Sequence, residues 1–251
     1  MNWSDWSLTI ALILVAGSAI LLLVIAILRR KSTPVFREIP AFSRLRKAIG
    51  LAVEDGSCLH VSLGRGSLAT TQGAAGLAGL STLRRLADLT STSDLTPIAT
   101  SGDSSLMILS QDVLQASYKE ATGGGHFDAT SARLTGLTPF SYASGTMPAL
   151  RDDHVSANIL LGNFGVEAGL LTDATEREQS FILAASDYLP AQAVLYASAQ
   201  EPLIGEELFA VSEYVNHSSM HAASLIVQDI LRWVLIISIL LGAILKLAGL
   251  L

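Results

Sequence analysis

Two long apolar runs, one near each end of the chain, constrain its fold more than any other feature. Residues 8–28 hold 21 positions without a charge, and residues 234–251 hold 18 positions of which only Lys246 is charged. A helix needs about 20 predominantly apolar residues to cross a bilayer. We therefore expect one membrane helix within residues 1–30 and another within residues 219–251, with a soluble domain between them.

The residues around the first run indicate a retained anchor and an orientation. Its start is acidic, with Asp5 and two tryptophans, and no small-residue cleavage site follows it, so a signal peptide is disfavoured. Basic residues favour the cytoplasmic flank of a span, and seven of them follow the first run: Arg29, Arg30, Lys31, Arg37, Arg44, Arg46 and Lys47. The pattern predicts both termini outside the cell and the central domain in the cytoplasm.

The charge balance of the central part restricts its partners. Residues 51–231 carry seven basic and twenty acidic side chains, so nucleic acid and anionic lipid should repel this region. The basic residues after the first run should instead contact lipid headgroups, which makes the bilayer the expected partner. Cys58 is the one cysteine of the chain, which excludes an internal disulfide and suits a reducing compartment.

Strands and helices alternate over residues 41–218, after a short linker at residues 31–40. We expect helices at residues 41–55, 104–122, 73–89, 140–150, 190–199 and 206–215. Strands are expected at residues 58–63, 96–100, 132–137, 155–161 and 181–185, with residues 166–171 pairing as a hairpin beside the fourth of them. This order favours a Rossmann-like, three-layer α/β domain with a largely parallel sheet.

A glycine-rich motif follows the first expected strand. Residues 64–69 fit the pattern G-x-G-x-x-G/A, in which glycines let backbone N–H groups approach a phosphate, and an arginine inside the motif could add a charge. The expected helix starts late, at residue 73. In the dinucleotide pattern, an acid at the end of the second strand, about 20 residues after the motif, binds the ribose. Asp88 lies near that distance but falls in an expected helix. Asp103 lies at the end of an expected strand, but too far along the chain. The hypothetical nucleotide site comprises Gly64, Arg65, Gly66, Ser67 and Asp103; the alternative is a tight turn.

The expected sheet supports a shared position for three loops. Ligands of open α/β sheets bind at the carboxyl ends of the strands. Residues 64–67, 101–103 and 162–165 would all lie there, and they could line one polar cleft. The alternative is that Gly, Ser and Asp are simply the residues from which turns are made.

Other constellations give weaker signals for chemistry. Glu213, His217 and His221 have the spacing of one helix face and could offer metal ligands, but a polar helix face near the membrane is the favoured interpretation. Cys58 and His60 point to the same side of a strand, where we expect both in the core. We therefore assign no metal site and no catalytic residue, and we lean against an enzymatic activity.

The apolar runs also contain small residues. Ser238 and Gly242 form a small-x-x-x-small pattern, which permits close helix contact either between the two spans or between subunits. Neither run carries the paired charges of a pore, so a channel is the least supported of the functions considered.

Four segments resemble an uncharacterised family of Chloroflexi-type bacteria, domain of unknown function 6754. These segments are His60–Gly64, Ser144–Met147, Ile204–Glu207 and Gln228–Trp233. The resemblance covers nearly the whole chain and implies an N-terminal span, a soluble domain and a C-terminal span in a bacterial inner membrane. It brings no catalytic residue with it.

These observations lead to two functional expectations from different classes. The first is a structural or assembly role as a membrane-anchored scaffold, with self-association into a homo-oligomer. The second is a membrane-tethered sensory domain that binds a nucleotide or another small ligand at the glycine-rich loops. The sequence identifies no cofactor for either function.

Overall fold

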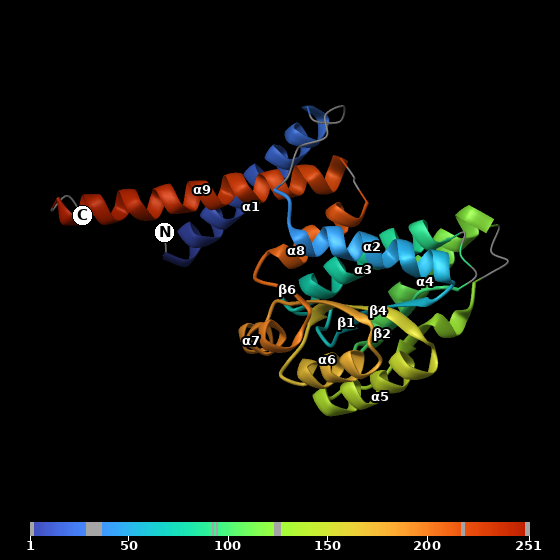
Figure 1. Cartoon of the computed structure of the whole chain (residues 1–251). Helices are drawn as coiled ribbons and strands as arrows, with labels where there is room; N and C mark the ends of the chain where they lie inside the picture. Colours follow the sequence, from blue (N-terminus) through green and yellow to red (C-terminus); the bar gives the residue numbers. More distant parts are fainter. Residues whose placement is uncertain are drawn as a thin grey trace. The chain divides into compact units, whose positions relative to one another are not determined.

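The computed structural model describes residues 3–28, 37–91, 93, 95–122, 127–216 and 219–248, which form two units (Figure 1). The central unit is Glu38–Asn216, and the terminal unit holds the segments on either side of it. Each unit is described below by itself.

The terminal unit consists of two long apolar helices that contact each other. Helix α1 spans Trp3–Leu28 and helix α9 spans Ser219–Leu247. Within them, Ser7–Leu28 and Met220–Leu247 are long and apolar enough to cross a membrane, with mean hydropathies of 3.1 and 2.3. Ile25 of α1 is buried against Ala223 and Val227 of α9. The two expected membrane helices are thus present as helices.

Gly17, Ser238 and Gly242 lie outside this contact. A side chain added at Gly17 or Gly242 would meet nothing within 4 Å, and Ser238 is exposed. Of the two uses expected for the pattern of Ser238 and Gly242, packing of α9 on α1 is therefore not the one seen, because Ile25, Ala223 and Val227 form that contact instead.

The central unit is built on a six-stranded parallel sheet. Its strands have the order β3-β2-β1-β4-β5-β6, and each pair of neighbours is parallel. This is the strand order of a doubly wound dinucleotide-binding fold, and it confirms the expected α/β class. The strands are β1 Cys58–Gly64, β2 Ile98–Ser101, β3 Ala132–Leu134, β4 Val155–Asn163, β5 Phe181–Ser186 and β6 Glu201–Leu203.

Helices cover both faces of this sheet (Figure 1). One face carries α2 Pro40–Asp55, α3 Gly73–Thr90, α4 Ser104–Thr122 and α8 Glu207–Val215. The other face carries α5 Pro139–Asp152, α6 Ala168–Arg177 and α7 Leu189–Ser198, and a short 3-10 helix, η1 Ala129–Ser131, precedes β3. Because strand and helix alternate, the chain packs a separate apolar core on each side of the sheet.

Helix α2 shows how local sequence sets the ends of an element. Pro40 starts the helix, where its missing N–H costs nothing. Phe42, Leu45 and Ile49 are spaced to lie on one face, and all three are buried. Gly56 ends the helix with φ of 64°, a left-handed conformation that glycine adopts without strain. This helix was expected from the sequence and is confirmed.

The two ends of the central unit meet at one place. The ring of Phe42, near the start of α2, stacks on that of Tyr214 in the last turn of α8, with centroids 4.2 Å apart. Arg44 of α2 pairs with Glu201, the first residue of β6. Since β6 begins at the amino edge of the sheet, the chain both enters and leaves the central unit at that edge.

The hairpin expected at residues 166–171 is wrong. Most of that segment belongs to helix α6, which starts at Ala168. Its flanking strands β4 and β5 are parallel neighbours, and two parallel strands need a crossover rather than a tight turn between them.

Strands β3 and β6 differ most from the expectation. Strand β3 ends at Leu134 rather than at residue 137, because Gly136 packs against the backbone of Ser141 in α5. Strand β6 was missed, since it has only three residues and contains a proline. Residues 123–125, the three glycines that follow α4, lie outside the described residues.

Candidate functional site at the carboxyl edge of the sheet

The strand order places a switch point between β1 and β4. In a doubly wound sheet, a ligand binds in the crevice outside the carboxyl ends of the strands at this point. The structure brings the three glycine-rich loops together there. The backbone N–H of Arg65 donates to the carbonyl of Asn163 at 2.9 Å, and that of Gly102 donates to the carbonyl of Gly64 at 2.8 Å.

The glycines of the motif make room for the protein's own backbone. Gly64 has φ of 72°, and a side chain added to it would collide with the backbone of Asn163. A side chain at Gly66 would collide with the carbonyl of Gln72 and lie 2.9 Å from Cβ of Asn163. The close approach that these glycines permit is therefore already used between the β1–α3 and β4–α6 loops.

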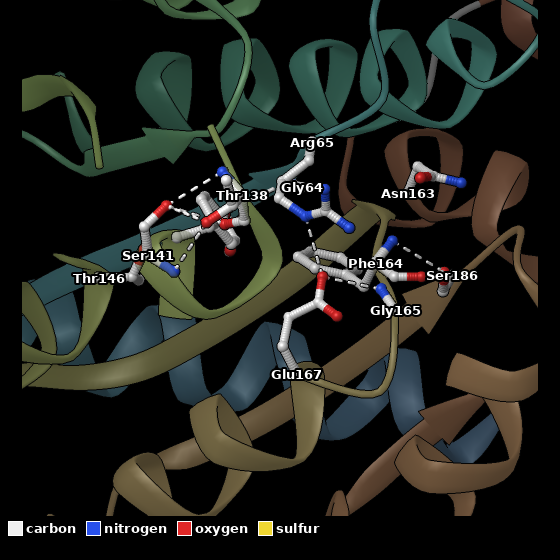
Figure 2. Close-up of polar contacts among 12 residues, drawn as sticks. Gly64, Arg65, Thr138, Ser141, Thr146, Asn163, Phe164, Gly165, Glu167 and Ser186 are labelled. Atoms are coloured by element: carbon white, nitrogen blue, oxygen red, sulfur yellow. Dashed lines mark hydrogen bonds and ion pairs between the residues drawn. The ribbon is translucent and has the colours of Figure 1, made fainter. Parts of the chain in front are cut away.

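The guanidinium of Arg65 is paired with a buried carboxylate (Figure 2). Its Nε lies 3.0 Å from Oε1 of Glu167, and the same oxygen accepts a hydrogen bond of 2.9 Å from the backbone N–H of Gly165. The side chain of Glu167 is 1% exposed and that of Arg65 is 21% exposed. Glu167 thus supplies the anion that an arginine and a loop N–H at a switch point would otherwise bind.

The remaining residues of the hypothetical nucleotide site have local roles. One carboxylate oxygen of Asp103 accepts from the backbone N–H groups of Ser105 and Leu106 at 3.0 and 3.1 Å, which makes this residue the N-terminal cap of α4. The carbonyl of Ser67 accepts from the backbone N–H of Thr70 in a turn before α3. The late start of the helix, expected from the sequence, is thus explained by this turn.

A chain of buried polar side chains crosses the sheet below these loops. Nδ1 of His60 lies 2.7 Å from Oδ1 of Asn158, and its Nε2 lies 2.9 Å from Oγ1 of Thr100. The amide of Asn158 in turn donates to the hydroxyl of Thr175 at 2.6 Å. Three strands and helix α6 are joined in this way, and each of the four side chains has a partner where water is excluded.

Tyr142 joins this network to the carboxyl edge. Its hydroxyl bonds to that of Ser62 in β1 and accepts from the backbone N–H of Gly64 at 3.3 Å. The preceding turn of α5 is held by a capping box between Thr138 and Ser141 (Figure 2), which fixes where the tyrosine enters the core. Burial raises the pKa of Tyr142, so its hydroxyl stays protonated.

His60 is neutral in the folded chain. Burial lowers its pKa from 6.5 to about 4, against the hydrogen bond that its Nδ1 makes to Oδ1 of Asn158, which acts to raise the pKa. The unfolded chain binds the proton more readily, so stability should be lost as pH falls from about 6.5 towards 4. We expect about 2 kcal/mol less stability at pH 5 than at pH 8 from this group. Denaturant unfolding at pH 5 and pH 8 measures this difference in the free energy of unfolding. The His60→Gln variant should show a difference that is smaller by the contribution of His60. A variant with the same difference as the wild type would contradict the prediction.

Cys58 is placed where the sequence expected it, in the core. Its side chain is buried, and burial raises the pKa of the thiol to about 11, with the charge of Asp153 acting in the same direction. A thiol with so high a pKa holds almost no thiolate at neutral pH and is a poor nucleophile.

The three residues considered as possible metal ligands do not share one helix face. Helix α8 ends at Val215, so Glu213 and His221 lie on different helices, and His217 lies outside the described residues. Within the described residues, no group of three or more His, Cys, Asp and Glu side chains is arranged to hold a metal ion.

Several cavities in the described part of the chain lie away from the carboxyl edge, and two of them are polar hollows beside the sheet. One of about 640 Å³ lies beside the C-terminal parts of α6 and α7 and is lined by polar side chains, among them Asp173, Glu176 and Ser198. Another of about 260 Å³ lies at the amino edge beside Cys58 and the ion pair of Arg133 with Asp153. Neither includes a residue of the hypothetical nucleotide site.

Sequence reasoning missed several residues that matter at this edge. Glu167 is in the segment taken for a strand, and nothing in its neighbourhood points to Arg65, which is 102 positions away. Asn158 did carry a signal, because it is a polar residue in the middle of a largely apolar strand. A polar residue in a buried strand requires a partner, and that requirement leads to His60 and Thr175.

The four segments that carry the family resemblance have structural roles. His60–Gly64 contributes to the buried network, and Gly145 in Ser144–Met147 fits against the carbonyl of Thr135. Gly205 in Ile204–Glu207 has φ of 65° and forms the turn after β6, and Gln228–Trp233 lies in α9.

The comparisons with known proteins agree with this resemblance. No curated protein and no solved structure matches the chain. A family described as Domain of unknown function (DUF6754) matches residues 1–250. Because the match covers almost the whole sequence, the chain belongs to the DUF6754 family.

Proposed function

We propose that the chain is a bacterial inner-membrane scaffold, a homo-oligomer whose α/β domain serves assembly rather than catalysis. The observation that carries this proposal is the pairing of Arg65 with buried Glu167 at the switch point. A doubly wound domain that binds nucleotides keeps this position open. Here the protein's own side chains and backbone occupy it.

The helices of the terminal unit support self-association. Ser238 and Gly242 lie outside the contact of α9 with α1, so the face that permits the closest approach of another helix is unused within one chain. A neighbouring copy in the same membrane offers a matching face. The basic residues after the first span further support a topology in which the central unit is cytoplasmic and both termini are outside.

The test is the mass of the intact chain in lipid nanodiscs or mild detergent, measured by native mass spectrometry. We expect a dimer or a larger homo-oligomer over a range of protein concentrations. Gly242→Leu should weaken self-association, because it fills the proposed contact face of α9. Gly17→Leu in α1 is the matched control and should leave the mass unchanged, since both sites have open space around them. A wild-type chain that remains monomeric in nanodiscs would contradict the proposal.

A second candidate function is binding of a nucleotide or small anionic ligand at the same crevice. The strand order favours it, since this order creates the switch point. Binding would require Arg65 to leave Glu167. Glu167→Gln weakens that pair, so this function predicts stronger thermal stabilisation of the variant than of the wild type by ATP or NAD. Equal and negligible shifts for both proteins would exclude it.

A further inference from the structure

A small hollow lies between the C-terminal parts of α3 and α4, with a volume of about 310 Å³. The hydroxyl of Tyr118 donates to the carbonyl of Thr90 at 3.2 Å and holds the end of α3 against α4. The glycine-rich loops precede the first turns of the same helices, so the hollow is separate from the switch point. Among the residues that line it are two basic residues, two acidic residues and one serine: Arg84, Arg85, Asp88, Glu120 and Ser117.

The hydroxyl of Ser117 indicates that this hollow takes a polar occupant. Ser117 is 2% exposed, and its Oγ makes no hydrogen bond to any described residue. By contrast, Ser110 of the same helix donates to the carbonyl of Leu106 at 2.7 Å, and Thr90 of α3 donates to that of Leu86 at 2.9 Å. A buried hydroxyl without a partner is rare in folded proteins. A polar molecule in the adjoining hollow would supply the partner that Ser117 lacks.

The charged groups at the hollow are balanced in sign and available to a ligand. Within the described part of the chain, neither Arg84 nor Arg85 has an ion pair or a side-chain hydrogen bond. A guanidinium group binds a carboxylate or a phosphate through paired hydrogen bonds. Asp88 and Glu120 accept hydrogen bonds from an ammonium group, and the partial negative charge at the C-terminal ends of two helices also favours a cation. The lining therefore suits a ligand that carries one charge of each sign.

We propose that this hollow binds a small zwitterion of the amino-acid class. The carboxylate of the ligand contacts Arg84 and Arg85, and its ammonium group contacts Asp88 and Glu120. The hydroxyl of Ser117 bonds to the ligand after a rotation about χ1. A phosphate monoester carries close to two negative charges at neutral pH, so a carboxylate fits the balanced lining better. The volume is at the lower end of the range for ligand pockets, which excludes a dinucleotide.

The experiment measures binding to the full-length chain in mild detergent by isothermal titration calorimetry. The probes are L-alanine, 4-aminobutyrate and 6-aminohexanoate, which separate their two charges by increasing distances. We expect at least one of them to bind with a Kd below about 10 mM. Butyrate and butylammonium carry only one of the two charges and should bind at least about tenfold more weakly than the best zwitterion. Arg85→Gln and Asp88→Asn each remove one matching charge and should raise the Kd of that zwitterion at least about tenfold.

Two serines of α4 separate contact with the ligand from an effect on folding. Ser117→Ala removes a hydroxyl that has no partner, so the free variant should unfold at the wild-type midpoint or above it while its Kd for the zwitterion rises. Ser110→Ala is the matched control, because Ser110 is equally buried on the same helix and its hydroxyl already has a partner. This control should leave the Kd unchanged. Circular dichroism verifies that each variant is folded.

The outcomes decide the proposal without reference to the oligomeric state. Binding that is weakened by Arg85→Gln, Asp88→Asn and Ser117→Ala, and not by Ser110→Ala, supports the site. A wild-type chain that binds none of the three zwitterions overturns it. Equal binding by the wild type and the three site variants also overturns it, because the ligand then lies elsewhere. Butyrate or butylammonium that binds as tightly as the best zwitterion overturns the ligand class.

Discussion

Replacing Gly162 with alanine should destabilise the central unit by about 3 kcal/mol or more. Gly162 lies in β4 beside β1, and a Cβ there would collide with the carbonyl of Leu63 and approach the backbone nitrogen of Gly64 to 3.0 Å. Both strands are central in the sheet, so neither can move aside without disturbing its other neighbour. Thermal or urea unfolding of the full chain in detergent, followed by circular dichroism, measures the loss.

Gly50→Ala provides the matched control for this change. Gly50 is exposed on α2, and an added Cβ meets nothing within 4 Å. Alanine favours a helix over glycine by up to about 1 kcal/mol, so this variant should be as stable as the wild type or more so. If Gly162→Ala unfolds at the same midpoint as the wild type, the backbone of β1 does not lie as close to Gly162 as described, and the prediction is contradicted.

Arg65→Ala should cost about 3–5 kcal/mol, since it leaves the charge of Glu167 buried without its partner. The carboxylate is 1% exposed and keeps only the hydrogen bond from the backbone N–H of Gly165. Unfolding in urea, analysed for both midpoint and slope, gives the change in free energy. The expected loss far exceeds that for an arginine at the protein surface.

Arg177→Ala tests that comparison directly. Arg177 pairs with Asp173 on α6 at 2.9 Å, with side chains that are 76% and 55% exposed, and such a pair contributes at most about 0.5 kcal/mol. Adding Glu167→Gln to Arg65→Ala should recover much of the lost stability, because the buried group is then uncharged. Equal losses of stability for Arg65→Ala and Arg177→Ala would show that burial does not increase the contribution of the Arg65–Glu167 pair to stability.

Elements that bury a continuous apolar stretch were predictable from the sequence. Strands β1, β4 and β5 and helices α2, α3 and α4 carry their period and their ends within one short window, so local reasoning finds them. Residues 166–171 mislead the same reasoning, because a short apolar run fits a strand and a helix equally well. What decides between them is the parallel pairing of β4 with β5, which no local window contains.

The position of the candidate site was predictable from the sequence, but the pairing of Arg65 with Glu167 inside it was not. Gly64 and Gly102 lie at strand ends, and parallel strands bring their ends to one edge, so the meeting of the loops follows from the pattern. Arg65 at this edge pairs with Glu167, which is far away from it in the sequence, so local patterns do not reveal the pair. A pattern of glycines shows where a backbone approaches something closely; it does not show whether a ligand or another loop is approached.

The stacking of Phe42 on Tyr214 makes the central unit behave as an insert. A domain whose entrance and exit coincide adds no net displacement to the path between the segments that flank it. The same geometry permits a domain to be inserted between two adjacent helices, and it permits transfer of the α/β domain to another such pair. For engineering, the central unit Glu38–Asn216 is therefore a domain that can be inserted between two adjacent helices of another protein.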